Sequence, residues 1–397
     1  MTDRIYYTEP YVASFDATVL DVEDLASEHA GRRGVVLDRT AFYPTSGGQP
    51  FDVGRLGSGR VVDVVDREDG SIVHVVEGEV ERGPVRGQVE WGRRFDHMQQ
   101  HTGQHVLSAA FDRLLHVRTE SFHLGSSSST IDLAREVSTN EIHQAESEAN
   151  KIVWEDRPVT IRFADASTAA NLPLRKESVR QGVLRLIEIE DFDVSACGGT
   201  HVARTGAIGV IAIASSERFK GATRLEFVCG TRALETYRGL RDSVTASTRL
   251  LSVLPGELPA GIERVQTEAK VLKKQLRDLQ ARLALHEAAA MADQSEPLAG
   301  ARAVVTALEG WDANGLKSIA SAIAARPGHL ALLIGTRPPM PIVIARAPDV
   351  SVDCAALLAR LTSKFGGKGG GRPELAQGGG LDGRPDEILS AARAALR

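Results

Sequence analysis

Two short motifs that carry metal-ligand side chains, HTGQH at residues 101–105 and CGGTH at residues 197–201, constrain this fold more than any other feature. His101 and His105 stand four residues apart in a predicted helix, so their side chains lie on one face. Cys197 and His201 repeat this spacing in a glycine-rich turn. One thiolate and three imidazoles form a ligand set that suits tetrahedral zinc. Because a long segment separates the two pairs, the sequence predicts a zinc site within a large domain rather than a zinc finger.

The sequence leaves one competing ligand open and argues against two kinds of zinc enzyme. His97 lies four residues before His101, so three histidines share one stripe of the helix, and the sequence does not choose between the pairs. A zincin protease would need glutamate where Thr102 stands. A zinc deaminase would need H-x-E followed by P-C-x-x-C, which is absent. The motifs therefore indicate a zinc site of another class.

The composition is typical of a folded protein with several domains. A chain of 397 residues exceeds what one hydrophobic core usually serves, which predicts two to four domains. No apolar run spans a bilayer and the N-terminus lacks a secretory signal, so we expect a cytoplasmic protein with no membrane partner. Three widely spaced cysteines cannot build a disulfide framework. With a net charge of -5, a polyanionic partner would require a local basic patch.

Changes in residue pattern predict an α+β chain with four domains. Residues 1–92 alternate short β-rich runs with turns, which indicates a small β-barrel interrupted by a shaped loop, FYPTSGGQPFDVG, at residues 42–54. Residues 93–231 predict an α+β zinc domain. Residues 297–397 predict a compact α/β domain that ends in a glycine loop, FGGKGGGRPELAQGGGLDG, and a last helix. Residues 232–296 predict a helical arm with apolar residues at coiled-coil spacing: Ile262, Val265, Ala269, Leu272, Leu276, Leu279 and Leu283.

Taken together, these motifs resemble one known family. HTGQH followed far downstream by CGGTH resembles the zinc motif pair of the editing domain that alanyl-tRNA synthetases share with the free-standing AlaX proteins. FYPTSGGQPFDVG resembles the glycine-rich loop of the preceding barrel, and ATRLEFVCG resembles the closing strand of the editing domain. FGGKGGGRPELAQGGG resembles the C-terminal DHHA1 domain. Because the chain starts directly at the barrel, it leaves no room for an aminoacylation domain, and it is identified as a long-form AlaX protein.

The resemblance implies a trans-editing hydrolase that removes a wrong amino acid, chiefly serine with glycine as a second substrate, from alanine tRNA. Binding alone separates such similar amino acids by only about 10 to 200-fold, so a second site must sort them. Zinc held by His101, His105, Cys197 and His201 would bind the hydroxyl or activate water. Four protein ligands fill the tetrahedron that is typical of structural zinc. Either one ligand is displaced, or the ion acts through a fifth contact.

The resemblance also implies roles for residues around the metal. Thr102 and Gln104 belong to the helical motif and are catalytic candidates, although Gln104 stands where the synthetases usually carry threonine. His123 in SFHLG matches a glutamine position that lines the family's pocket, and it is a candidate for contact with substrate or water. Three residues of the glycine-rich loop are candidates for contact with the acceptor end of the tRNA: Gly47, Gly48 and Gln49.

The C-terminal part is expected to bind tRNA and to form a homodimer. Lys368 and Arg372 lie in the glycine loop, where two cations and exposed backbone N–H groups could hold phosphate. Two alternative functions stay open. The chain could be a tRNA-binding module in which zinc only holds the fold, or it could deacylate another small aminoacyl-tRNA.

Overall fold

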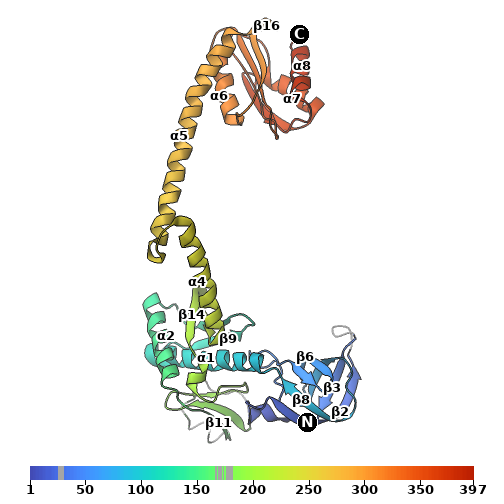
Figure 1. The fold of residues 1–397 in the computed structure, drawn as a ribbon, viewed down its shortest axis with the longest axis vertical. Helices are drawn as coiled ribbons and strands as arrows, with labels where there is room; N and C mark the ends of the chain where they lie inside the picture. Colours follow the sequence, from blue (N-terminus) through green and yellow to red (C-terminus); the bar gives the residue numbers. More distant parts are fainter. Residues whose placement is uncertain (26–30, 166–167, 169–171, 173, 176–181) are drawn as a thin grey trace. The chain divides into compact units, whose positions relative to one another are not determined.

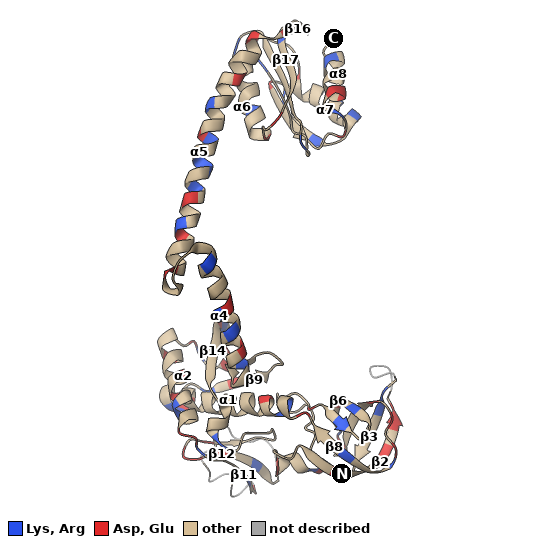
Figure 2. Ribbon diagram, viewed as in Figure 1, with Lys and Arg blue, Asp and Glu red and all other residues tan. Residues whose placement is uncertain are grey.

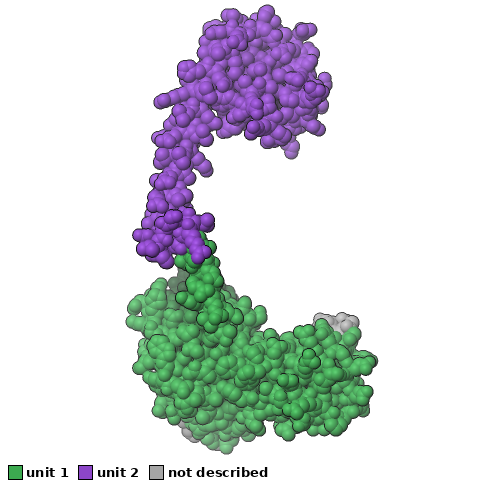
Figure 3. All heavy atoms as spheres, in the orientation of Figure 1, with its two compact units in different colours: residues 1–246 green, residues 247–397 purple. Residues whose placement is uncertain are grey.

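The computed structural model describes residues 1–25, 31–165, 168, 172, 174–175 and 182–397. The chain forms two compact units, residues 1–246 and residues 247–397 (Figure 3). Helix α4, Thr231–Leu251, crosses this boundary. The α+β class expected from the sequence is confirmed, whereas the finer division into four domains stays a prediction.

Unit 1 begins with the predicted β-barrel, which is closed and follows the strand order β2-β3-β7-β6-β5-β8 (Figure 1). All neighbouring strands are antiparallel. Side chains alternate between the two faces of a strand, and on β2 this places Phe15, Ala17 and Val19 in the barrel core. The strands are β2 Ser14–Asp24, β3 Arg33–Leu37, β5 Gly54–Leu56, β6 Gly59–Asp66, β7 Ile72–Glu77 and β8 Gly83–Val89. Strands β1 Asp3–Arg4 and β4 Arg39–Thr40 form a separate two-stranded parallel sheet.

Helix α1, Trp91–Leu115, follows the barrel directly and forms the axis of the second half of unit 1 (Figure 1). All residues from His97 to Phe111 are buried, because the helix is covered on several sides. Its core contacts come from helix α2, Thr139–Trp154, and from an antiparallel sheet of order β14-β15-β10-β9. These strands are β9 Thr119–Leu124, β10 Ser129–Leu133, β14 Ile211–Phe219 and β15 Ala222–Cys229.

A second, three-stranded sheet carries the downstream ligand motif. Its order is β11-β12-β13, with β11 Val159–Ala164, β12 Leu184–Ile189 and β13 Asp193–Ala196. The CGGTH turn starts immediately after β13. Helix α2 begins with a capping box, in which the Ser138 side chain accepts from Glu141 N–H and the Glu141 carboxylate accepts from Ser138 N–H.

Unit 2 is an α/β domain preceded by a long helix, α5, Leu258–Asp293. Its six-stranded sheet has the order β16-β17-β18-β19-β21-β20. One face packs against the end of α5 and α6, and the other face packs against α7 and α8. The elements are β16 Glu296–Leu298, β17 Ala301–Leu308, α6 Ala313–Ala324, β18 His329–Gly335, β19 Ile342–Arg346, α7 Cys354–Phe365, β20 Lys368–Arg372, β21 Leu375–Gly379 and α8 Pro385–Ala395.

The glycine loop expected near the C-terminus is wrong, since the structure has a β-hairpin there, formed by β20 and β21 at the edge of the sheet. A Cβ atom at Gly371 would lie 2.3 Å from the Leu375 carbonyl oxygen, and one at Gly369 would lie 2.7 Å from Gly378 Cα. Glycine is required because backbones approach closely, not because the segment is irregular. A glycine-rich composition alone does not separate these two cases.

The coiled-coil stripe predicted for the arm is exposed on α5. Leu272, Leu276, Leu279 and Leu283 are each half-exposed or more. Lys, Arg, Asp and Glu alternate along the rest of the helix surface (Figure 2). Within the described residues, no helix is both long and apolar enough to cross a membrane.

Candidate metal centre

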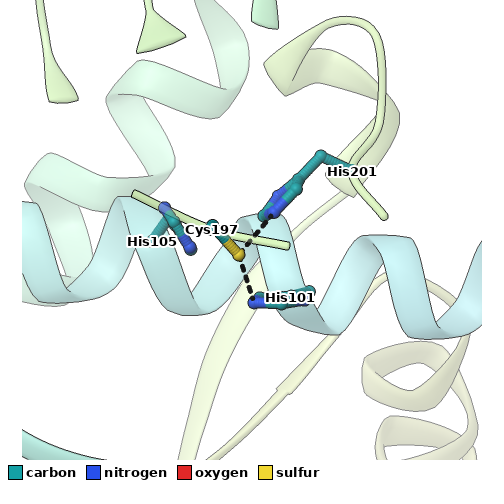
Figure 4. Close-up of side chains that lie close together, drawn as sticks. All are labelled: His101, His105, Cys197 and His201. Atoms are coloured by element: carbon teal, nitrogen blue, oxygen red, sulfur yellow. Dashed lines mark hydrogen bonds between the residues drawn. The ribbon is translucent and has the colours of Figure 1, made fainter. Parts of the chain in front are cut away.

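The two predicted ligand pairs meet inside unit 1. His101, His105, Cys197 and His201 bring one ligand atom each to within 4.8 Å of one another (Figure 4). The Cys197 Sγ atom lies 3.4 Å from His101 Nε2 and 3.4 Å from His201 Nε2. Zinc–nitrogen and zinc–sulfur bonds of about 2.0 and 2.3 Å in a tetrahedron require nitrogen–sulfur separations of about 3.5 Å. The donor set and its spacing therefore fit a tetrahedral metal ion.

Helix geometry and a glycine explain how the pairs come so close. His101 and His105 project from the same face of α1, with ring centroids 5.3 Å apart. The CGGTH turn lies against that face, and the His201 and His101 ring centroids are 4.4 Å apart. A Cβ atom at Gly199 would lie 2.2 Å from His101 Cε1. Any other residue at this position would push the turn away from the helix.

The His101 ring is oriented by a residue of the glycine-rich loop. Its Nδ1 atom lies 2.9 Å from Gln49 Oε1, which also accepts from Thr200 N–H at 3.0 Å. The Gln49 amide nitrogen donates to Thr200 Oγ1 at 2.8 Å. Gln49 is fully buried, so its side chain joins the loop to the ligand motif on both sides. This position supports a role in holding His101 rather than contact with the acceptor end.

The His105 ring is oriented by a buried carboxylate that the motif analysis missed. His105 Nδ1 lies 3.3 Å from Asp193 Oδ2. Asp193 is held in turn by Arg175 Nε at 2.8 Å and by the Ser195 hydroxyl, which donates at 2.9 Å. A carboxylate behind a ligand histidine fixes its tautomer and ring orientation. Asp193 lies on β13, only four residues before Cys197, but no local pattern marks it as a partner of His105.

Thr102 orients the third imidazole. Its hydroxyl donates to the Met98 carbonyl at 2.8 Å, so its oxygen is free to accept from His201 Nδ1 at 3.2 Å. It also accepts from Val202 N–H at 3.1 Å. All three rings thus have an acceptor at Nδ1, which leaves each Nε2 as the ligand atom. Thr102 is a positioning residue in this arrangement.

The charge states of Cys197 and His201 favour metal binding, whereas the pKa of His105 is raised, because its burial is outweighed by Asp193 and Cys197. Burial opposes ionisation of Cys197, but His101 and His201 outweigh it and hold the pKa of the thiol well below its ordinary value. Burial, together with the neighbouring His101, lowers the pKa of His201 to about 3, so this ring is neutral at physiological pH. A thiolate and neutral imidazoles are the forms that bind zinc.

A pocket opens beside the cluster. Cys197 and His105 contribute to its wall together with Tyr7, Gln104, Phe122 and Arg185. Phe122 also packs on His101, with ring centroids 5.8 Å apart. Two of the four metal ligands, His105 and Cys197, therefore border a space that a small group can enter.

Arg185 is a buried cation in this wall that the sequence analysis did not identify. Its Nε atom donates to the Tyr7 carbonyl at 2.9 Å, and Nη1 donates to the Cys197 carbonyl at 2.6 Å. Its Nη2 atom is buried and has no partner among the described residues. Burial is the largest cause that lowers the pKa of Arg185. The sequence alone does not distinguish Arg185 on β12 from other arginines in strands, because its hydrogen-bond partners come from other segments.

Several predicted residues lie elsewhere. His97 is buried outside the four-ligand cluster, and burial lowers its pKa to about 4. His123 is exposed on β9 opposite Thr130 and does not line the pocket, whereas the four residues before it, Thr119 to Phe122, do. The prediction that His123 contacts substrate therefore has no support from this geometry.

The remaining nucleic-acid candidates are exposed. Gly47 lines the pocket, and Gly48 approaches Phe122 so closely that a Cβ atom would lie 2.8 Å from its ring. Both have positive φ, which favours glycine. Lys368 and Arg372 are exposed on β20, and Arg372 shares a surface hollow with Lys317.

Three family models match the chain. The model "tRNA synthetases class II (A)" matches residues 2–93, "Threonyl and Alanyl tRNA synthetase second additional domain" matches residues 184–226, and "DHHA1 domain" matches residues 300–397. The first covers the barrel, the second covers β12 through the CGGTH turn into β15, and the third covers the sheet of unit 2 from β17 onward.

Full-length relatives agree with these matches. The chain is 37% identical to the alanine–tRNA ligase of Halobacterium salinarum over 408 residues, covering 98% of this chain and 44% of the ligase. It is 34% identical to the Pyrococcus abyssi ligase over 395 residues, covering 95% of this chain and 42% of that protein. It thus spans less than half of these ligases. The alanyl-tRNA editing protein AlaX-L of Pyrococcus horikoshii is 31% identical over 411 residues, which cover 100% of this chain and 99% of that protein. On this end-to-end match, together with the meeting of HTGQH and CGGTH in one cluster, the chain belongs to the AlaX family of alanyl-tRNA editing proteins, in its long form.

Proposed function

We propose that this protein hydrolyses the ester between a wrongly attached amino acid, chiefly serine and secondarily glycine, and the terminal ribose of alanine tRNA. The observation that carries this proposal is the position of the His/Cys cluster in the wall of a pocket. A purely structural metal site would not need a pocket beside its ligands. The full-length similarity to an alanyl-tRNA editing protein supports the same substrate class.

We infer that the metal is zinc, held by His101, His105, Cys197 and His201. Three nitrogen donors and one sulfur donor favour zinc over magnesium or calcium, which prefer oxygen. When bound, zinc supplies Lewis-acid chemistry that activates water or polarises an oxygen of the substrate. The chain's own residues fix the ligand atoms through Gln49, Asp193 and Thr102.

The pocket wall supports recognition of a negatively charged substrate end. Arg185 places a buried positive charge beside Cys197, and its Nη2 atom is free to donate to an oxygen of the acceptor nucleotide or of the ester. Phe122 and Tyr7 provide apolar surface that excludes water. A local cation is needed because the whole chain carries a net charge of -5.

Unit 2 is proposed to bind the body of the tRNA. Lys368 and Arg372 are exposed on β20, the edge strand of the sheet, where both cations can reach phosphate. Phosphate contacts position a nucleic acid without reading its sequence.

A homodimer through α5 is the proposed assembly. Its exposed stripe at coiled-coil spacing supports pairing with a second copy. Replacement of Leu272, Leu276 and Leu279 by Ser should halve the mass in solution, measured by light scattering. An unchanged mass would remove α5 from the interface.

A structural role for zinc is the second candidate function, because the four protein ligands alone complete a tetrahedron. Purified protein incubated with Ser-tRNA(Ala), Gly-tRNA(Ala) and Ala-tRNA(Ala) separates the two. Catalytic deacylation of Ser-tRNA(Ala) at a higher rate than Ala-tRNA(Ala) supports the hydrolase. Stoichiometric binding without turnover, in protein that contains zinc, would contradict it and favour the binding module.

A further inference from the structure

We propose that Gln104 reads the side-chain hydroxyl of the substrate amino acid and makes serine the preferred substrate over both glycine and alanine. This inference rests on the proposed hydrolase function and concerns the same pocket. It assigns the specificity to a residue that holds no metal and that lies beside the ligand His105 on helix α1.

The first observation is an unused acceptor. Gln104 lines the pocket, is 2% exposed, and its Oε1 atom is buried with no hydrogen-bond partner among the described residues. A buried acceptor without a partner costs about 1–3 kcal/mol. A ligand that donates a hydrogen bond to this atom recovers that free energy, and a ligand that only fills the space does not.

The second observation is that the other end of the same amide is fixed. Gln104 Nε2 donates to Ser108 Oγ at 2.8 Å. Ser108 Oγ also accepts from the Thr119 hydroxyl at 2.8 Å, and Thr119 lines the same pocket from β9. Gln104 and Ser108 are four residues apart on α1, so the bond follows one face of the helix. The amide is therefore held in place by its nitrogen, while its oxygen has no partner among the described residues.

The third observation is the chemical contrast within the wall. Of the buried side-chain atoms without a partner, two belong to described residues that line this pocket, Gln104 Oε1 and Arg185 Nη2. Arg185 can only donate, and it suits a phosphate or carbonyl oxygen. Gln104 Oε1 can only accept, and it suits a hydroxyl proton. The two unpaired atoms match the two kinds of polar group that a seryl ester brings.

This arrangement discriminates in the direction that editing requires. A serine hydroxyl satisfies Oε1, whereas the alanine methyl group and the glycine hydrogen leave it buried and unpaired. A site built to bind a hydroxyl rejects a substrate that lacks one far more strongly than an apolar pocket rejects an added group. The correct product, alanyl-tRNA, is thereby spared by the same atom that selects the error.

The test compares Gln104→Leu, Ser108→Ala and wild type by kcat/KM on Ser-tRNA(Ala) and Gly-tRNA(Ala). Gln104→Leu keeps the shape and removes the acceptor, so its serine rate should fall roughly 10 to 100-fold while its glycine rate changes by less than about threefold. Ser108→Ala frees the amide and should cause a smaller loss in the same direction. Gln144→Leu, at an exposed position on α2, is the matched control and should resemble wild type.

The outcomes separate this inference from the proposed function. If wild type hydrolyses neither ester, the proposed function fails. If wild type is active and Gln104→Leu retains the serine-to-glycine ratio of wild type, the role of Gln104 is overturned. Should Gln104→Leu not fold, calorimetry of wild type with non-hydrolysable seryl and alanyl amides of 3′-amino-adenosine decides. Tighter binding of the seryl amide supports the inference, and equal binding overturns it.

Discussion

The metal centre of unit 1 and the glycine hairpin of unit 2 show two ways to present polar groups. In unit 1 each ligand histidine is buried and held at Nδ1 by a second side chain. In unit 2, Lys368 and Arg372 are exposed and form no ion pair within the described part of the chain. Chemistry at one atom requires fixed geometry, whereas attraction to a polyanion does not. Substitutions should therefore have large, specific effects in unit 1 and small, additive ones in unit 2.

The largest effect is expected for Cys197→Ser. Loss of the thiolate removes one of four ligands and the link between the CGGTH turn and α1, so zinc content should fall from about one per chain toward zero. The melting temperature of unit 1 should fall by several degrees. Metal analysis and calorimetry measure both. Cys354→Ser, which removes a buried thiol from unit 2, should keep its zinc, and full zinc with unchanged melting in Cys197→Ser would reject the ligand assignment.

The next largest effect is expected for the stability of the barrel at low pH. Burial lowers the pKa of His74 to about 4, so the folded barrel holds this ring neutral while the unfolded chain takes up a proton near pH 6.5. The pKa is depressed in the folded state, so stability is full above pH 6.5 and decreases as the pH falls toward 4. The loss is about 3 kcal/mol. Denaturant unfolding of metal-free wild type and His74→Gln at pH 7 to 4.5 measures it. Equal pH dependence in both proteins would argue against this role.

Substitution of a residue that hydrogen-bonds to a ligand histidine should have an intermediate effect. Gln49→Ala leaves His101 without its Nδ1 partner, and zinc affinity should fall roughly 10 to 100-fold in competition with a chelator. Gln88→Ala, at an exposed position of the barrel, is the control. If Gln49 instead contacts the acceptor end, zinc affinity will stay at the wild-type value and only KM for tRNA will rise.

The smallest effect is expected in unit 2. Lys368→Ala combined with Arg372→Ala should weaken tRNA binding several-fold and reduce the slope of log affinity against log salt by about two. The zinc content should not change. Lys273→Ala combined with Lys274→Ala on α5 removes the same charge as a control. A wild-type salt slope in the hairpin variant would show that these cations do not contact phosphate.

The sequence predicted the four candidate metal ligands, because each ligand pair is contained in one short motif. The i, i+4 pair on a helix and the paired cysteine and histidine in a turn can be read from HTGQH and CGGTH. Asp193 and the positioning role of Gln49 could not be read, because each depends on a tertiary contact with a ligand histidine. The barrel was predictable from its short β-rich runs separated by turns.

The errors come from patterns that fit more than one structure. The motif SFHLG placed His123 at the pocket, whereas the pocket is lined by the residues of β9 that precede it, up to Phe122. A run of glycines predicts a loop as well as a closely packed hairpin, and only the neighbouring backbone decides. In both places the missing information is how a strand lies against its neighbours, which tertiary structure supplies.

The central claim, that unit 1 holds zinc through three Nε2 atoms and one Sγ atom, is tested most directly by X-ray absorption at the zinc edge of the purified protein. The expected spectrum has three nitrogen neighbours at about 2.0 Å and one sulfur neighbour at about 2.3 Å. The sulfur contribution should disappear in any zinc that remains bound to Cys197→Ser. A spectrum of nitrogen and oxygen neighbours without sulfur in wild type would contradict the account.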